Sequence, residues 1–331
     1  MIWRLSRRTL IFLTGSCWGG LIGVTLTLSI QEQYAIAYQE LDKSSSVDES
    51  TCDLERKCKE VGYPSNENIY ITSSYVCSFS PFLRTPSWVM EYVSQNKTIP
   101  KSGRSKGNRN RSAFFAESAI QSPFRASNSD YQCGTEIGLS RGHLAPAQMH
   151  KETQKEVDDT FNLSLNIVPQ FMSTNGCDWY RLETMVKKLS KKYEEAWVIT
   201  GPAFIPIAKE AHHGKKTMHK IEFDLLGEKR VAVPTHLFKI ILGKSASPES
   251  SFHCAAFLLP NGPIVDEAGL TRYQIDIDEL ESYTGLNFFT KIRTRALEAE
   301  KIKSVNPMSL LLPHSSSSFK DMCKEEVCEG K

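Results

Sequence analysis

The stretch GLSRGHLAPA at 138–147 places Arg141 and His143 on either side of a glycine, just before a proline. A neutral imidazole titrates near physiological pH, so His143 is a candidate general base. A guanidinium holds phosphate through two parallel hydrogen bonds, so Arg141 is a candidate phosphate ligand. Taken alone, the stretch is also compatible with an ordinary turn that contains a structural histidine. The residues downstream therefore decide between a turn and a reaction centre.

Downstream of this stretch the chain offers amide and carboxylate oxygens, the ligands that a hard cation such as Mg²⁺ prefers. They are Asn162, Asn166, Asn175 and Glu183. Hydrolysis of a phosphodiester needs a base, a cation that takes up charge, and groups that hold the phosphate. All three kinds of residue are present within one segment of the chain.

The segment after Asn175 has the apolar spacing of a helix. Its apolar positions recur at intervals of three and four residues, and lysines gather toward its C-terminal end. Asp178 is the predicted N-cap of this helix. Asn175 precedes the helix and Glu183 lies in its first turns, so we expect the amide and the carboxylate to face one point.

The pattern around these motifs predicts a single α+β domain. Runs rich in β-branched or aromatic residues, bounded by Gly, Pro or Asn, are predicted strands of a central sheet at 196–204, 229–243 and 251–262. The basic segment KSGRSKGNRNRS at 101–112 is predicted to be an exposed loop, with nucleic-acid contact or plain solvation as its two interpretations.

The composition excludes some classes of protein. With 40% hydrophobic and 24% charged residues the chain is globular in type, and its net charge of +2 does not by itself indicate a polyanionic partner. The nine cysteines form no CxxC pair, so a disulfide framework or a zinc finger is not indicated.

The N-terminus differs from the rest of the chain. Arginines at 4, 7 and 8 precede a run from Thr9 to Gln31 that carries no charge, long enough to cross a bilayer. A cleavable signal has a shorter apolar region of roughly 7–15 residues, so an uncleaved anchor is favoured over a signal peptide. Glycines at 15, 19 and 23 would let two such helices pack closely, or are ordinary membrane-helix residues.

The order of the motifs resembles the DNA/RNA non-specific endonuclease family of the ββα-metal (His-Me finger) fold, and most closely its mitochondrial exo/endonuclease G branch. The match rests on SRGHLAPA at 140–147, on FNLSLNIVPQ at 161–170, and on the spacing of Asn175, Trp179 and Glu183. Fainter similarities extend it over roughly 63–290. The resemblance implies a ββα-metal nuclease core on a central, mostly antiparallel sheet with flanking helices.

The resemblance also implies roles for the residues that match the family's motifs. His143 would be the general base, and Asn175 the one direct protein ligand of a hydrated Mg²⁺, for which Mn²⁺ is a substitute. Glu183 would orient water on the metal, and Arg141 would hold the phosphate and stabilise its charge.

Three further residues are carried over with supporting roles. Asn166 and Asn162 would support the histidine and the phosphate, and Ser140 would contact the substrate. Most of the wider family has Asp at the position of Ser140, and the exo/endonuclease G branch resembles this chain in having Ser. Gln148, Met149 and His150 stand where the family often has asparagine.

The implied activity is Mg²⁺-dependent, sequence-non-specific hydrolysis of DNA, with RNA as a second candidate substrate, leaving 5′-phosphate ends. Endonuclease and exonuclease modes both stay open, because the branch carries a longer helical extension than the residues after Phe289 provide. Two rival interpretations are a catalytically weak, membrane-tethered nucleic-acid-binding protein and a secreted digestive nuclease. A separate metal site at His212, His213 and His219 is a minor alternative.

The expected organisation has four parts. Residues 1–31 are a basic region and transmembrane or targeting segment, 32–60 a polar linker, 61–292 the nuclease domain, and 293–331 a peripheral C-terminal tail. An anchor on a member of this branch indicates the mitochondrial inner membrane, with the domain facing the intermembrane space and with homodimers as the family implies. The alternative is the secretory pathway, where sequons at Asn96, Asn110 and Asn162 would be glycosylation candidates.

Overall fold

A computed structural model of the protein describes residues 49–94, 106–209, 218–246, 251–263, 269–303, 319–325 and 328. From Ser50 onward these residues belong to one compact unit. Within the described residues no helix is both long and apolar enough to cross a membrane. The predicted anchor at 9–31, most of the linker, Asn96, His212 and His213 lie outside the described ranges.

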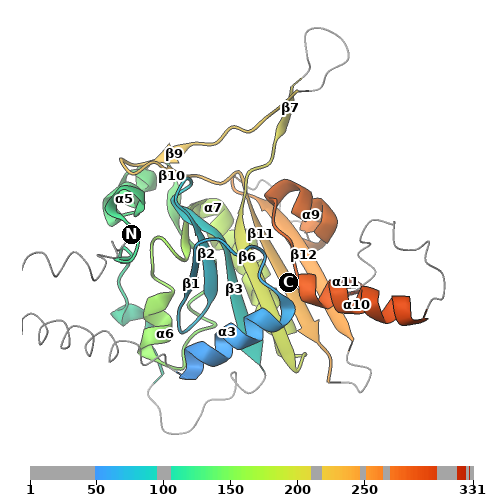
Figure 1. Ribbon diagram of the computed structural model, residues 1–331. Helices are drawn as coiled ribbons and strands as arrows, with labels where there is room; N and C mark the ends of the chain where they lie inside the picture. Colours follow the sequence, from blue (N-terminus) through green and yellow to red (C-terminus); the bar gives the residue numbers. More distant parts are fainter. Residues whose placement is uncertain are drawn as a thin grey trace, which may run out of the picture. The chain divides into compact units, whose positions relative to one another are not determined.

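One sheet runs through the centre of the domain (Figure 1). Its strands follow the order β1 (Ile69–Ile71), β2 (Val76–Ser80), β3 (Thr85–Ser94), β6 (Glu195–Ala203), β11 (His236–Lys244), β12 (Phe252–Pro260) and β13 (Gln274–Ile275). Every neighbouring pair along this path is antiparallel, and only β14 (Lys320–Asp321) joins β12 in parallel. The α+β class and the mostly antiparallel sheet predicted from sequence are confirmed.

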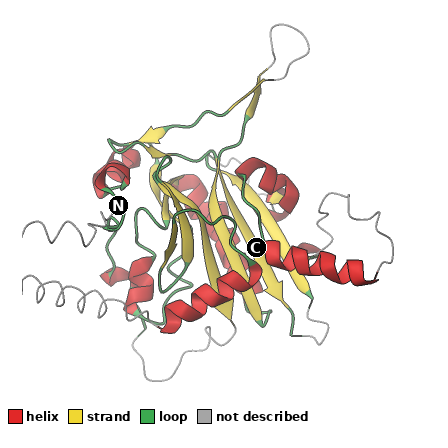
Figure 2. Ribbon diagram, viewed as in Figure 1, coloured by secondary structure: helices red, strands yellow, loops and turns green. Residues whose placement is uncertain are grey.

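Helices cover both faces of this sheet (Figures 1 and 2). Alternate residues of a strand point to opposite faces, so each strand supplies two separate cores. On one face α3 (Glu49–Val61), α9 (Ile277–Thr284) and α10 (Thr290–Lys303) pack against Trp88, Ile199 and Phe238. On the other face α8 (Tyr180–Ser190) packs against Val198 and Ile241. The sheet is therefore the middle of three layers, and the α8 layer carries the candidate site.

Three short hairpins and three short helices are further elements of the part of the domain that the structure describes. They are the hairpins β4 (Leu139–His143) with β5 (Ile167–Phe171), β7 (Ile207–Lys209) with β8 (Met218–Lys220) and β9 (Leu225–Leu226) with β10 (Val231–Ala232), and the helices α5 (Asn128–Glu136), α6 (Gln154–Asp159) and α7 (Met172–Thr174). Strand β7 projects away from the body (Figure 1). His219 lies exposed on β8.

The strands predicted from sequence are present with one change. The runs at 196–204 and 251–262 correspond to β6 and β12. The run at 229–243 divides at Pro234 into β10 and β11, because proline has no N–H to donate to a strand ladder.

The predicted N-cap at Asp178 is wrong. Residues Asn175–Trp179 form a π-helical turn, η3, in which Cys177 has φ −116° and ψ −105°, and α8 starts only at Tyr180. Asp178 is buried and accepts hydrogen bonds from Arg181 Nη1 at 2.7 Å and from the Tyr273 hydroxyl at 2.7 Å. The carboxylate holds the start of the helix against the 270–273 segment.

The sequence predicts a peripheral C-terminal tail, but part of this tail packs against the domain. Residues 319–325 add β14 and the short helix α11 (Met322–Glu325) to the domain. Met322 and Cys328 are buried in the core beneath α8. Cys323 and Cys328 form a disulfide, a pair five residues apart that no CxxC pattern could reveal.

Candidate active site

The predicted reaction-centre residues lie on one ββα unit formed by β4, β5 and α8. Strands β4 and β5 pair antiparallel with Arg141 opposite Pro169 and His143 opposite Ile167. The chain then passes through α7 and η3 into α8, which carries Glu183. Two strands and a helix therefore place Arg141, His143 and Glu183 on one unit, although Arg141 and Glu183 are 42 positions apart in the sequence.

His143 lies in an aromatic slot at the end of β4. Its ring packs against Phe114, at 5.6 Å between centroids, and edge-on against Phe161, at 5.1 Å. Its Nε2 atom is buried and has no hydrogen-bond partner. Burial, together with the positive charge of Arg109, lowers the pKa of His143 to about 3. The imidazole is therefore neutral at physiological pH, the state that a proton acceptor needs.

Arg141 is held by stacking rather than by an ion pair. Its guanidinium lies 5.0 Å from the ring centre of Phe114 and 5.9 Å from that of Tyr131. A long contact of 3.5 Å joins its Nη2 to the carbonyl of Asn128, and its Nε is buried without a partner. The planar group is fixed in place while keeping donors for an anion, as a phosphate ligand requires.

Ser140 and Asn175 are in direct contact with each other. The Asn175 Nδ2 group donates to the Ser140 hydroxyl at 3.1 Å, and that hydroxyl donates to the Gln170 carbonyl at 3.0 Å. The Ser140 hydroxyl therefore orients Asn175, and its role in binding substrate stays a prediction. Because the amide nitrogen of Asn175 is used, its oxygen Oδ1 is the atom left for a cation.

Gln170 lies beneath this pair. It is 0% exposed, and neither atom of its amide has a hydrogen-bond partner. A Cβ at position 142 would approach Gln170 Oε1 to 2.2 Å, so only glycine fits there. The Gln170 amide therefore packs against Gly142 with both of its polar atoms unpaired, on the residue whose carbonyl accepts from Ser140.

Glu183 is partly buried on α8 and accepts a hydrogen bond of 3.4 Å from Gln148 Nε2. Burial raises the pKa of Glu183 to about 7, and the nearby carboxylate of Glu91 adds to the rise, while the Lys239 ammonium opposes it. Gln148, which differs from the family's usual asparagine, thus contacts a candidate catalytic residue.

Asn166 is buried inside the protein, and its amide contacts the backbone. It is 0% exposed; its Oδ1 accepts from the Ala145 N–H at 2.8 Å, and its Nδ2 donates to the carbonyls of Ala145 and Thr160 at 2.9 and 2.7 Å. These contacts are structural, and the catalytic role of Asn166 stays a prediction. Asn166 anchors the backbone that follows His143, which agrees with the support implied by the resemblance.

Replacing Asn166 with alanine is expected to reduce the free energy of unfolding by roughly 3 kcal/mol, because three buried backbone groups lose their partner. Urea unfolding followed by tryptophan fluorescence measures the change. Asn110→Ala, at an exposed position of the same residue type, is the control and should stay within about 0.5 kcal/mol of wild type. An Asn166→Ala protein as stable as wild type would contradict this structural role.

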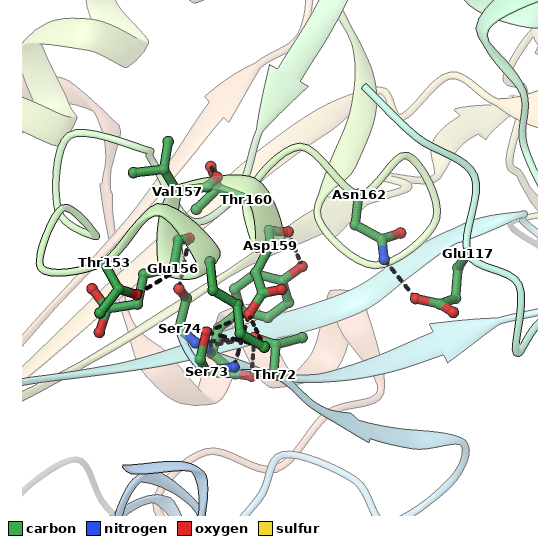
Figure 3. A network of polar contacts seen from close by, with 12 residues as sticks. Thr72, Ser73, Ser74, Glu117, Thr153, Glu156, Val157, Asp159, Thr160 and Asn162 are labelled. Atoms are coloured by element: carbon green, nitrogen blue, oxygen red, sulfur yellow. Dashed lines mark hydrogen bonds and ion pairs between the residues drawn. The ribbon is translucent and has the colours of Figure 1, made fainter. Parts of the chain in front are cut away.

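Asn162 is also buried, at 2% exposure. Its oxygen accepts from the N–H groups of Ser164 and Leu165, both at 3.1 Å, and its nitrogen donates to Glu117 at 2.8 Å (Figure 3). The amide of Asn162 is therefore used inside the protein, and its role in binding substrate stays a prediction.

The same close-up shows how the segment before Asn162 is fixed. Asp159 at the end of α6 accepts from the backbone and side chain of Ser73 and from Lys155 (Figure 3). The Asp159 carbonyl accepts from the Tyr75 hydroxyl at 2.7 Å. These contacts join α6 to the turn between β1 and β2, and so hold the 160–166 segment beside β4.

Some predicted neighbours are not in direct contact. No hydrogen bond joins His143 to Asn175 or Glu183, three side chains that the structure describes, although all three lie on the ββα unit. The sequence interpretation named Gln148 only as a departure from the family and Arg109 only within the basic segment, and it did not single out Lys239. Arg109 lies in the described part of the basic loop, on the 3₁₀ turn Arg109–Arg111, and its guanidinium is 5.8 Å from the ring centre of Phe161.

A hairpin that carries a histidine is followed by a helix that carries a carboxylate, which is the ββα arrangement of the class that the sequence resembles. The profile of the family described as DNA/RNA non-specific endonuclease matches residues 55–295. Nuclease EXOG, mitochondrial, from Xenopus laevis is 35% identical over 237 residues, covering 71% of this chain and 62% of that protein. Endonuclease G, mitochondrial, from Homo sapiens is 32% identical over 235 residues, covering 71% of this chain and 74% of that protein.

A solved structure agrees with these matches. The crystal structure of the EndoG/EndoGI complex contains a chain that matches with a TM-score of 0.64 and 29% identity, over 75% of this chain and 94% of that one. The protein belongs to the DNA/RNA non-specific endonuclease family. It spans 62% of the length of the Xenopus EXOG relative.

Proposed function

We propose that the protein is a divalent-metal-dependent nuclease that hydrolyses phosphodiester bonds of DNA, and of RNA as a second substrate, without sequence specificity, leaving 5′-phosphate ends. The observation that carries the proposal is the buried, unpaired His143 Nε2 in a slot next to the stacked guanidinium of Arg141. A base and a phosphate ligand on one strand are suited to attack of water on a phosphodiester.

The residues present fit Mg²⁺. Asn175 offers one hard oxygen, Gln170 offers an unpaired buried amide, and Glu183 offers a carboxylate on the following helix. Among the described residues no group of three or more His, Cys, Asp or Glu side chains could share an ion, which suits an ion held by a single direct protein ligand and water. When bound, the ion supplies stabilisation for the charge that develops on the phosphate.

The side chains divide the remaining work. Arg141 binds a non-bridging phosphate oxygen, His143 takes the proton from the attacking water, and Glu183 accepts a hydrogen bond from water at the site. A bound phosphate raises the pKa of His143 from its low value, because negative charge favours the imidazolium. The histidine becomes a stronger base only when substrate is present.

Location and assembly are part of the same proposal. The relatives in Xenopus and human are both named mitochondrial. The charge-free run at 9–31 supports an anchor in the mitochondrial inner membrane, with the nuclease domain in the intermembrane space. The buried amide of Asn162 supports this location over the secretory route, because a glycan attached to that sequon before folding would have no space in the folded protein. The proposed assembly of the protein is a homodimer.

One comparison tests the activity. Purified protein in Mg²⁺ buffer should degrade linear and covalently closed circular DNA, and EDTA should stop both reactions. Digestion of the linear substrate alone would establish an exonuclease mode. DNA binding without cleavage, in Mg²⁺ and in Mn²⁺, would reject the proposal in favour of a nucleic-acid-binding protein.

A further inference from the structure

A buried polar row crosses the α8-facing side of the central sheet. Lys239 on β11 lies directly opposite Thr200 on β6, and Glu91 on β3 is part of the same face. Their neighbours along the strands, Leu237 and Val198, are core residues of that face. Lys239 is only 1% exposed, and burying an ammonium costs solvation free energy that an apolar residue would not lose.

The ammonium of Lys239 contacts both halves of the candidate site. It donates to the carbonyl of Leu144 at 3.2 Å and to the Thr200 hydroxyl at 2.6 Å. It also lies 5.0 Å from the ring centre of Trp179. Leu144 directly follows His143, and Trp179 precedes Glu183 by one helical turn.

The other charged groups near Lys239 have their own roles. Glu91 is hydrogen-bonded to His150 at 2.7 Å, and both side chains are buried. Burial lowers the pKa of Lys239, while the negative charges of Glu91 and Glu183 raise it. The lysine therefore lies in a field set up by two carboxylates, one of which belongs to the candidate site.

We propose that Lys239 is a positioning residue of the active site. Its ammonium ties the Leu144 carbonyl to the Trp179 ring, and so holds His143 on β4 and Glu183 on α8 at a fixed separation. Asn166 anchors the other side of the same backbone through Ala145. The segment that follows His143 is thus held from two directions, by an amide within its own layer and by an ammonium from the sheet. This inference rests on the proposed nuclease function.

The test is Lys239→Met, which keeps the length of the side chain and removes its charge. We expect kcat on DNA to fall roughly ten- to a hundredfold, since a displacement of about 1 Å has that effect on a reaction. The KM for DNA should stay within about twofold, because Lys239 touches no substrate. The melting temperature should also fall by several degrees, because loss of the ammonium leaves the buried carboxylate of Glu91 without a counter-charge, so kcat is compared per folded protein well below the melting transition.

Two further variants separate positioning from folding. Thr200→Val removes one partner of the ammonium and keeps the charge, so kcat should fall by about fivefold. Ile241→Val, on the same strand and face, should lower the melting temperature and leave kcat unchanged. Hydrogen exchange without metal should become faster over residues 141–148 in Lys239→Met and stay the same over α9.

The outcomes distinguish this inference from the proposed function. If wild-type protein cuts DNA while Lys239→Met keeps its kcat and its exchange rates at 141–148, the positioning role is wrong and the nuclease function stands. If kcat falls only in proportion to lost folded protein, as in a destabilised core variant, Lys239 is structural and the inference is equally wrong. If wild-type protein does not cut DNA, the proposed function itself fails, whereas the exchange experiment still tests the contact between Lys239 and the strand.

Discussion

His143→Ala is expected to reduce kcat by roughly a hundred- to ten-thousandfold, the range that a general base contributes. The ring fills a slot between Phe114 and Phe161 and offers no hydrogen bond to the rest of the protein through Nε2. Its removal should therefore affect chemistry far more than DNA binding. Steady-state cleavage of a fluorescent duplex gives kcat and KM, and fluorescence anisotropy in EDTA gives the affinity.

His219→Ala is the matched control, because that histidine is exposed on β8. It should cut DNA at the wild-type rate. A His143→Ala protein that also cut at the wild-type rate would show that another group accepts the proton, and the role given to Arg141 and His143 would have to be abandoned.

Added imidazole should restore part of the rate that His143→Ala loses, since the emptied slot is lined by aromatic rings that suit a small heterocycle.

The fold could be predicted from the sequence where the determining pattern is local. Runs of β-branched and aromatic residues with bounding Gly, Pro or Asn mark β6 and β12, and three- and four-residue spacing marks α8. The start of α8 could not be predicted, because a buried hydrogen bond between Asp178 and Tyr273, 95 positions away, replaces the expected N-cap. A tertiary contact decided the role of a residue that local rules assign to a helix end.

The placement of the candidate residues on one ββα unit agrees with their order in the sequence, but the contacts of each side chain could not be predicted. Asn162 and Asn166 have the residue type of a ligand, yet their amides are used by Glu117 and by the backbone at Ala145. Such partners lie far away in sequence, so no motif reveals whether an asparagine is free. Lys239 did leave a signal, a charge at a position of β11 where Leu237 and Ile241 on the same face are apolar.

Glu183→Gln is expected to abolish most activity and to increase stability at the same time. Burial raises the pKa of Glu183 in the folded protein to about 7, above its unfolded value of 4.5. Between these two pH values the folded state binds more protons than the unfolded state, so the free energy of unfolding falls as pH rises through that window. The rise in pKa from 4.5 to about 7 corresponds to roughly 3 kcal/mol of unfolding free energy, which the folded protein has lost above pH 7.

The neutral amide of glutamine does not incur this cost. In EDTA at pH 8 the Glu183→Gln protein should therefore resist urea better than wild type, by up to roughly 3 kcal/mol, whereas at pH 4 the two should unfold at the same urea concentration. Activity in Mg²⁺ should fall about a hundredfold, because an amide holds water at the site less firmly than a carboxylate does.

The control is Glu67→Gln, a carboxylate away from α8, which should change neither stability nor rate. Equal stability of the Glu183→Gln and wild-type proteins at pH 8 would mean that the carboxylate is ionised in the folded protein without penalty, and the buried position assigned to it on α8 would be wrong. A gain in unfolding free energy together with a loss of cleavage rate would show that Glu183 is needed for catalysis although it destabilises the folded protein. Active sites retain such groups, because a charge that is poorly solvated in the free protein interacts most strongly with the cation and water it is there to hold.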